Sequence, residues 1–265
     1  MTGQILEAKS YRVGTLKVEV HPSGKAAGVA AARAAGHALV ELGRSRDSIG
    51  VIFATGASQL DTLEALTKIA NLPWNKVSGF HLDEYIGISG NHFASFQRYL
   101  REKLTDKVPM KEFFAIDGCV PDIDKACQEY VSKLRSADPQ LCLLGIGENG
   151  HLAFNDPPVA NFSDDVDIKV VQLDDQCRQQ QTAEGWFSSV EQVPESAITL
   201  TIPALFRVPK LILSVPGARK AKIIRRTFED PVSTECPATI LRTHPDATIY
   251  LDPESASELD GLVLS

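Results

Sequence analysis

Two segments of the sequence place glycines beside titratable and amide side chains where an apolar run ends. The first, Gly145–Pro157, contains Asn149, His151 and Asp156 and follows a run of aliphatic residues. The second, Phe80–Gly87, also follows an apolar run and carries two consecutive acids. Loops of this composition at strand ends are typical of catalytic sites, and they predict acid-base chemistry on a small polar substrate.

His151 is the main candidate for proton transfer. An imidazole titrates near neutral pH in model peptides, and Asn149 and Asp156 are close enough in the sequence to orient this one. A single histidine is more often structural, but the glycines around His151 favour a functional role. Asp83 and Glu84 point to opposite sides of an extended chain, so we expect one to face the substrate and the other to bind backbone or a neighbouring group.

A third segment, Thr55–Ser58, is suited to bind an anion such as a phosphate group. It joins an apolar run to a helical pattern, and its small residues let backbone N–H groups and two hydroxyl groups approach an anion at the helix N-terminus. In the alternative interpretation, Ser58 caps the helix and Gly56 permits a tight turn. Arg178 and Lys220 are candidate phosphate ligands, although most Lys and Arg residues are solvated surface charges.

These loops need a scaffold that brings them together, and the alternation of patterns along the chain predicts one. Buried parallel strands are indicated by apolar runs at Leu16–Val20, Ile49–Ala54, Val77–His81, Gln140–Gly145, Ile168–Val171, Ala197–Thr201, Lys210–Val215 and Ala247–Leu251. Helical patterns lie between several of them, at Gly24–Leu42, Ser58–Ile69, Phe93–Leu104, Asp122–Leu134 and Gly217–Thr227. The alternation predicts a doubly wound α/β sheet, in which ligands bind beyond the carboxyl ends of the strands.

The composition fits one domain and excludes several classes of partner. The chain has 265 residues, 43% of them hydrophobic, and no Pro/Gly/Ser-rich linker divides it, so we expect residues 1–265 to form a single domain. A net charge of -7 without a Lys/Arg-rich stripe argues against a nucleic-acid partner. We expect a cytoplasmic protein, because no apolar stretch approaches a membrane span and the first residues lack a signal sequence. The five cysteines lack C-x-x-C spacing, so no zinc site is expected.

Together the motifs resemble the glucosamine-6-phosphate deaminase (isomerase) family, within the superfamily that also contains 6-phosphogluconolactonases. The resemblance covers nearly the whole chain and rests on Thr55–Ser58, Phe80–Tyr85, Gly145–Pro157 and Gly217–Lys220. It implies a Rossmann-like three-layer α/β fold with a mostly parallel central sheet and helices on both faces. It also implies conversion of glucosamine 6-phosphate to fructose 6-phosphate and ammonia, without a metal or organic cofactor.

The resemblance also implies roles for individual residues. Asp83 matches the acid-base carboxylate that moves a proton between C2 and C1 of the open-chain sugar. His151 matches the residue that assists opening of the pyranose ring, and Asn149 and Asp156 complete the ring-opening group, where the family commonly has Glu in place of Asp156. The residues matched to phosphate binding are Thr55, Gly56, Ala57, Ser58, Arg178 and Lys220.

The chain departs from the family pattern in ways that bear on regulation. Ala57 stands for a usual Gly and Gln59 for a usual Pro, which leaves the backbone donors of the loop intact. Between Pro157 and Lys169 the chain lacks the basic cluster with which allosteric members bind an activating sugar phosphate, so we expect no such activation. The sequence is compatible with a homo-oligomer but does not determine the oligomeric state.

Three other functions are considered. A sugar-lactone hydrolase of the 6-phosphogluconolactonase type would use His151 to activate water, but the segments around Asp83 and Asp156 resemble the deaminases more. A non-catalytic sugar-phosphate sensor would keep the phosphate ligands and could lose Asp83 or His151, and this chain retains both. A galactosamine-6-phosphate deaminase would differ only in the side chains that recognise the 4-hydroxyl group.

Overall fold

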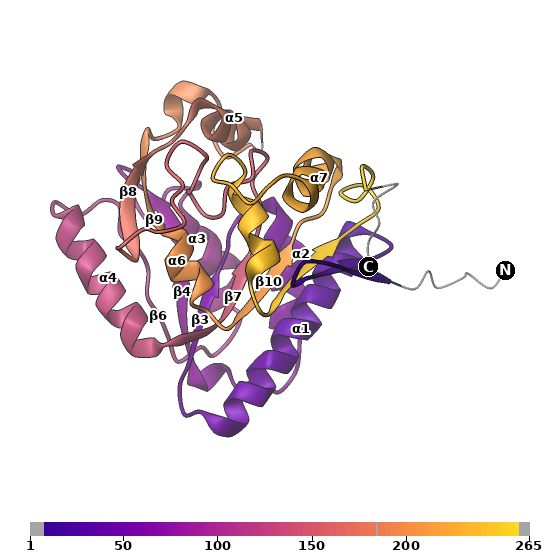
Figure 1. The fold of residues 1–265 in the computed structure, drawn as a ribbon. Coiled ribbons are helices and arrows are strands. Elements are labelled where there is room, and N and C mark those ends of the chain that lie inside the picture. Colours follow the sequence, from indigo (N-terminus) through magenta and orange to yellow (C-terminus); the bar gives the residue numbers. More distant parts are fainter. Residues whose placement is uncertain (1–7, 184, 260–265) are drawn as a thin grey trace.

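A central sheet of eight strands forms the middle layer of the molecule in a computed structural model, which describes residues 8–183 and 185–259 (Figure 1). The strand order is β1-β2-β11-β10-β7-β3-β4-β6, and every neighbouring pair is parallel except β1 and β2. The strands are β1 (Lys9–Val13), β2 (Leu16–Val20), β3 (Ile49–Phe53), β4 (Val77–His81), β6 (Glu112–Phe113), β7 (Pro139–Leu144), β10 (Lys210–Ser214) and β11 (Ala247–Leu251). The expected mostly parallel α/β sheet is therefore confirmed.

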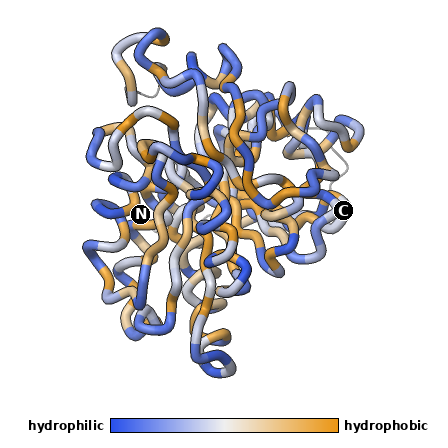
Figure 2. Tube along the Cα trace, turned by 90° about the vertical axis from the view of Figure 1, so that its left-hand side faces the viewer, coloured by the Kyte–Doolittle hydropathy of each residue, from blue (hydrophilic) through white to orange (hydrophobic). Residues whose placement is uncertain are grey.

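Helices cover both faces of this sheet because successive residues of its strands face opposite sides. In β7, Leu141 and Leu143 pack with helices α1 and α2, whereas Cys142 and Leu144 pack with the helices of the other face. The helices are α1 (Gly24–Ser45), α2 (Leu60–Thr67), α3 (Phe96–Leu100), α4 (Ile123–Ala137), α5 (Asp175–Ala183), α6 (Ile202–Phe206) and α7 (Ala221–Glu229). Figure 2 shows the hydrophobic residues concentrated along the central strands, between these two layers.

Two of the expected parallel strands belong to a different sheet. The runs at Ile168–Val171 and Ala197–Thr201 form β8 (Ile168–Gln172) and β9 (Ser196–Leu200), which pair antiparallel with each other. β9 also pairs antiparallel with β5 (Asp83–Tyr85), so the smaller sheet has the order β5-β9-β8. An apolar run reports burial and not strand direction, which is why the sequence placed these runs in the parallel sheet.

The helix boundaries differ from the expected ones where the backbone changes its hydrogen-bonding pattern. The predicted helix at Phe93–Leu104 is α3 followed by a π-helical turn, Arg101–Thr105. The helix α5, which was not predicted, carries a run of glutamines and has a weakly apolar face. In Figure 1, α5 lies beyond the edge of the central sheet at which the parallel strands end.

No helix of the described residues is long and apolar enough to cross a membrane. The first seven residues, on which the expectation of no signal sequence rests, lie outside the described part of the chain.

Candidate functional site

A cavity of about 420 Å³ opens where the central strands end. The segments that follow β3, β4, β7 and β10 line it, and these four strands are neighbours in the sheet. Its volume is that of a small-molecule site. The sequence-predicted residues among its lining are Thr55, Gly56, Ala57, Ser58, Asp83, His151 and Lys220.

Two matching turns form one wall of the cavity. After β3, Gly56 has a φ of 96° and precedes a 3-10 turn, Ala57–Gln59, that leads into α2. After β10, Gly217 also has a φ of 96° and precedes a 3-10 turn, Ala218–Lys220, that leads into α7. Glycine is required at both positions because L side chains rarely adopt this φ. Two helix N-termini therefore face one cavity, and their N–H groups and dipoles favour an anion there.

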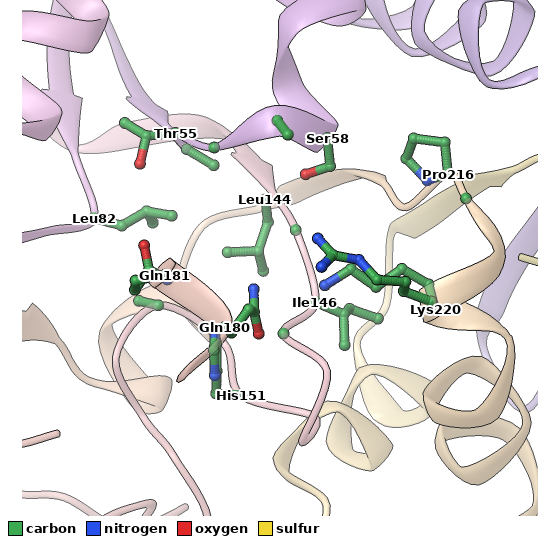
Figure 3. A pocket seen from close by; sticks show the side chains of 18 of the residues that line it. Thr55, Ser58, Leu82, Leu144, Ile146, His151, Gln180, Gln181, Pro216 and Lys220 are labelled. Carbon is green, nitrogen blue, oxygen red and sulfur yellow. The ribbon is translucent and has the colours of Figure 1, made fainter. Parts of the chain in front are cut away.

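The second turn also supplies positive charge. Arg219 and Lys220 both line the cavity, and the Arg219 Nε lies 3.3 Å from a carboxylate oxygen of Glu148. Figure 3 shows Lys220 and Ser58 on one side of the cavity and His151 on the other. Arg219 was not among the predicted ligands, although its place beside Lys220 in the same motif was a usable signal.

Arg178 is not brought together with the other predicted phosphate ligands. It lies on α5 but is not part of the cavity lining, and its Nη2 donates hydrogen bonds to the carbonyl oxygens of Val190 at 2.8 Å and Val193 at 3.2 Å. These bonds direct the guanidinium group toward the Val190–Val193 segment, so Arg178 anchors that segment to α5.

Strand β5 separates the two consecutive acids, as expected from the alternation of an extended chain. Asp83 is 7% exposed and lines the cavity. Glu84 points away, and its carboxylate accepts hydrogen bonds from the Ser95 hydroxyl group and from the backbone N–H groups of Tyr85, Phe96 and Gln97. Glu84 thus ties β5 to the start of α3, whereas Asp83 is available to a ligand.

The environment of Asp83 changes its titration. Burial raises the pKa of Asp83 well above its ordinary value, and the nearby carboxylates of Glu84 and Asp156 raise it further. A raised pKa makes the Asp83 carboxylate a stronger base than an ordinary one, and the carboxyl group can return the proton afterwards, which is what a general acid-base catalyst requires.

His151 belongs to a hydrogen-bonded group with the two residues that were expected to orient it. The His151 Nδ1 lies 2.7 Å from Oδ1 of Asp156, and the Asn149 Nδ2 donates to the same Oδ1 at 2.7 Å. The side-chain Oδ1 of Asn149 accepts from the His151 backbone N–H, and its Nδ2 also donates to Oδ2 of Asp174 at 3.3 Å. Asn149 and Asp156 do not line the cavity and act from behind the ring.

The charge state of Asp156 fixes the roles of the two ring nitrogens. Burial by itself would raise the pKa of Asp156, but the charge of His151 and hydrogen bonds from His151 and Asn149 lower it below its ordinary value. The ionised carboxylate only accepts hydrogen bonds, so the His151 Nδ1 is the donor. In the neutral ring the Nε2 is then the acceptor.

Gly147 permits the position of this ring. A Cβ atom on Gly147 would lie 2.2 Å from both Cε1 and Nε2 of His151, which no side chain allows. The Gly147 backbone N–H also donates to the His151 carbonyl oxygen at 3.0 Å, which closes the loop around the glycine. The ring therefore packs directly against the backbone of Gly147, three residues after the end of β7.

Cys177 lies next to the same carboxylate. One ligand atom from each of His151, Asp156 and Cys177 lies within 4.8 Å of the others, which is the spacing of a potential metal site. Burial raises the pKa of the Cys177 thiol well above its ordinary value, and the charge of Asp156 raises it further. The protonated thiol is a hydrogen-bond donor and joins His151 and Asn149 around the Asp156 carboxylate.

Helix α5 contributes glutamine side chains to the cavity that sequence reasoning missed. Gln180 accepts a hydrogen bond from the Glu148 backbone N–H, and Gln181 accepts one from the Tyr85 hydroxyl group at 2.8 Å. Both line the cavity, and Figure 3 shows them between His151 and Thr55. Trp186 and Phe96 add apolar lining. The sequence offers no signal for the two glutamines, because α5 itself was not recognised.

Comparison with known proteins matches most of the chain to one family. The model of the family described as glucosamine-6-phosphate isomerases/6-phosphogluconolactonase matches residues 22–250. A glucosamine-6-phosphate deaminase from Exiguobacterium sibiricum is 35% identical over 219 residues, which are 83% of this chain and 84% of that protein. Another, from Streptococcus thermophilus, is 34% identical over 206 residues, 78% of this chain and 86% of that protein.

Solved structures show the same likeness. A monomeric glucosamine-6-phosphate deaminase has a TM-score of 0.82 at 28% identity and covers 91% of this chain and 99% of its own. A 6-phosphogluconolactonase from Thermotoga maritima has a TM-score of 0.72 at 22% identity, with 89% and 98% covered, and shows the shared fold. The chain belongs to the family of glucosamine-6-phosphate isomerases and 6-phosphogluconolactonases.

Proposed function

We propose that the protein is a glucosamine-6-phosphate deaminase, which converts glucosamine 6-phosphate and water to fructose 6-phosphate and ammonia. The observation that carries this proposal is one cavity that combines an anion cradle with a buried carboxyl group of raised pKa and a carboxylate-oriented histidine. Curated relatives at 35% and 34% identity bear this name, which supports the same activity here.

The phosphate group of the substrate binds at the two helix N-termini. Backbone N–H groups of Thr55–Ser58 and of the turn after Gly217 surround it, and Arg219 and Lys220 balance its charge. Arg178, which the resemblance assigned to the phosphate, is not needed in this arrangement because its guanidinium group is bonded to Val190 and Val193.

His151 opens the pyranose ring. Its Nδ1–H is held by Asp156, so the Nε2 takes the proton from the anomeric hydroxyl group and passes it to the ring oxygen as the bond between C1 and that oxygen breaks. Asp156 is shorter by one methylene than the residue common in the family, yet it reaches the ring at 2.7 Å. The shorter side chain therefore still orients the imidazole.

Asp83 then carries the isomerisation. Its carboxylate removes the proton from C2 of the open-chain aminoaldehyde while the substrate's ammonium group gives a proton to the aldehyde oxygen, which yields an enolamine. The Asp83 carboxyl group then returns its proton to C1. The C2 centre becomes a protonated imine, water adds to it, and ammonia leaves to yield the ketone of fructose 6-phosphate. The raised pKa of Asp83 suits both halves of this transfer.

We infer that the chain acts as a single domain in the cytoplasm, on a small sugar phosphate and without a metal or organic cofactor. Light scattering tests whether the chain forms a homo-oligomer or is a monomer like the similar deaminase of known structure.

A substrate comparison tests the proposal. Purified protein is assayed with glucosamine 6-phosphate, galactosamine 6-phosphate and 6-phosphogluconolactone, with ammonia or acid release as the signal. The proposal predicts ammonia from glucosamine 6-phosphate and no acid from the lactone above the spontaneous rate. Hydrolysis of the lactone without ammonia release from either amino sugar would instead identify a lactonase.

A further inference from the structure

The side chain of Gln59 lies beneath the anion cradle, where three loops of the site meet. It follows the Thr55–Ser58 segment, is 1% exposed, and is directed into the protein between β7 and β10. Its Nε2 lies 3.0 Å from the Ser58 Oγ and 3.3 Å from the carbonyl oxygens of both Leu144 and Ser214. Leu144 and Ser214 are the last residues of their strands.

The orientation of this amide group is determined by its neighbours. Carbonyl oxygens only accept hydrogen bonds, so the atom facing Leu144 and Ser214 must be the donor nitrogen of Gln59. The packing around it is close, because a Cβ atom on Gly145 would lie 3.3 Å from the Gln59 Nε2 and 3.4 Å from the Ser58 Oγ. The two hydrogens of this amide are shared among three acceptors and link the cradle to the loop that leads to His151 and to the loop that leads to Lys220.

This geometry has a consequence for the Ser58 hydroxyl group, which lines the cavity. A hydroxyl group has one donor hydrogen and two acceptor lone pairs. When the Gln59 Nε2 donates to one lone pair, the hydroxyl hydrogen is left to donate in another direction. Figure 3 shows the Ser58 side chain directed into the cavity, where an anionic phosphate oxygen would accept this hydrogen.

We propose that Gln59 is a positioning residue for phosphate recognition: it holds the Ser58 hydroxyl group as a donor toward the bound phosphate group and fixes the ends of β7 and β10 beside it. The inference rests on the proposed function, because it takes the anion in this cavity to be the phosphate group of the substrate. Gln59 itself touches no substrate.

A double-mutant cycle with inorganic phosphate as the ligand tests this. Gln59→Met keeps the length of the side chain and removes the donor, Ser58→Ala removes the hydroxyl group, and the third variant combines both. Isothermal titration of the full chain gives the dissociation constant of phosphate for each. We expect each single change to weaken binding by about tenfold, which is the loss of one hydrogen bond to a charged group.

The double variant decides between a positioning role and a merely structural one. If Gln59 acts through Ser58, the double variant binds phosphate about as well as Ser58→Ala alone, because both changes remove the same hydrogen bond from the Ser58 hydroxyl group to the phosphate group. Two losses that multiply would overturn the inference, as would Gln59→Met with the affinity of wild type. If Gln59→Met does not fold, as judged by circular dichroism, Gln59→Leu takes its place, since it also removes the donor and adds no charge beside the phosphate group.

The steady-state kinetics separate this inference from the proposed function. For glucosamine 6-phosphate, Gln59→Met raises KM and changes kcat little, because phosphate contacts are made equally in the ground and transition states. A fall in kcat with unchanged KM would contradict the positioning role. Wild-type protein that binds phosphate but releases no ammonia would refute the deaminase proposal, while the phosphate cycle would still decide the role of Gln59.

Discussion

Replacing Gly147 with alanine tests the placement of His151 more sharply than replacing the histidine itself. The added methyl carbon lies 2.2 Å from Cε1 and Nε2 of the ring, whereas ordinary contact begins at 3.4 Å, so the ring must move by about 1.2 Å. The movement also breaks the 2.7 Å contact between the His151 Nδ1 and Asp156. A misplacement of about 1 Å costs about a hundredfold in rate, so we expect Gly147→Ala to lower kcat for ammonia release by about a hundredfold.

The matched control is Gly145→Ala in the same loop. Its methyl group meets Gln59 and Ser58 instead of His151, so it acts on phosphate affinity and not on the ring. Ammonia release gives kcat, and titration with inorganic phosphate gives the affinity of the cradle. Gly147→Ala should keep the phosphate affinity of wild type. A Gly147→Ala protein with kcat within about threefold of wild type would refute the assigned position of His151 or its part in the reaction.

Three further predictions concern the carboxylates and the cations. Asp83→Asn should abolish turnover and, at neutral pH, stabilise the fold. A carboxyl group whose folded-state pKa is raised contributes stability below its unfolded-state pKa and loses it as pH rises through the folded-state pKa. The difference in stability between Asp83→Asn and wild type should therefore close near pH 4, which unfolding midpoints measured from pH 4 to 8 check. A variant less stable than wild type at every pH would speak against this prediction. Glu84→Gln should lower the free energy of unfolding by about 2 kcal/mol. Each carboxylate oxygen of Glu84 accepts two hydrogen bonds, so the amide nitrogen that replaces one oxygen would face two donors. Unchanged denaturant midpoints would show that these bonds contribute little. Lys220→Ala should weaken phosphate binding by about tenfold, and Arg178→Ala by less than about twofold; the reverse order, measured by titration, would return Arg178 to the phosphate site.

Much of the scaffold followed from patterns that depend on local physics. A buried parallel strand must be apolar along its length, so β3, β4, β7, β10 and β11 were visible as apolar runs. Because loops at the carboxyl ends of neighbouring strands meet, the sequence also predicted that the segments near Thr55, Asp83 and Gly147 converge, and all three line one cavity.

The parts that could not be predicted depend on contacts between distant segments. The direction of β8 and β9 is set by their pairing with each other and with β5, and an apolar run carries no information on that pairing. Arg178 matched a phosphate ligand by motif, but where its side chain goes depends on the carbonyl groups of Val190 and Val193. Gln59 differed from the family pattern, and only the fold shows that its amide joins three loops.

The most direct test of the account measures ammonia and fructose 6-phosphate together, from one sample of glucosamine 6-phosphate, with wild-type protein and with Asp83→Asn. We expect equal amounts of the two products from wild type and neither from the variant, which should still bind inorganic phosphate with wild-type affinity. Ammonia without fructose 6-phosphate, or turnover by Asp83→Asn near the wild-type rate, would contradict it.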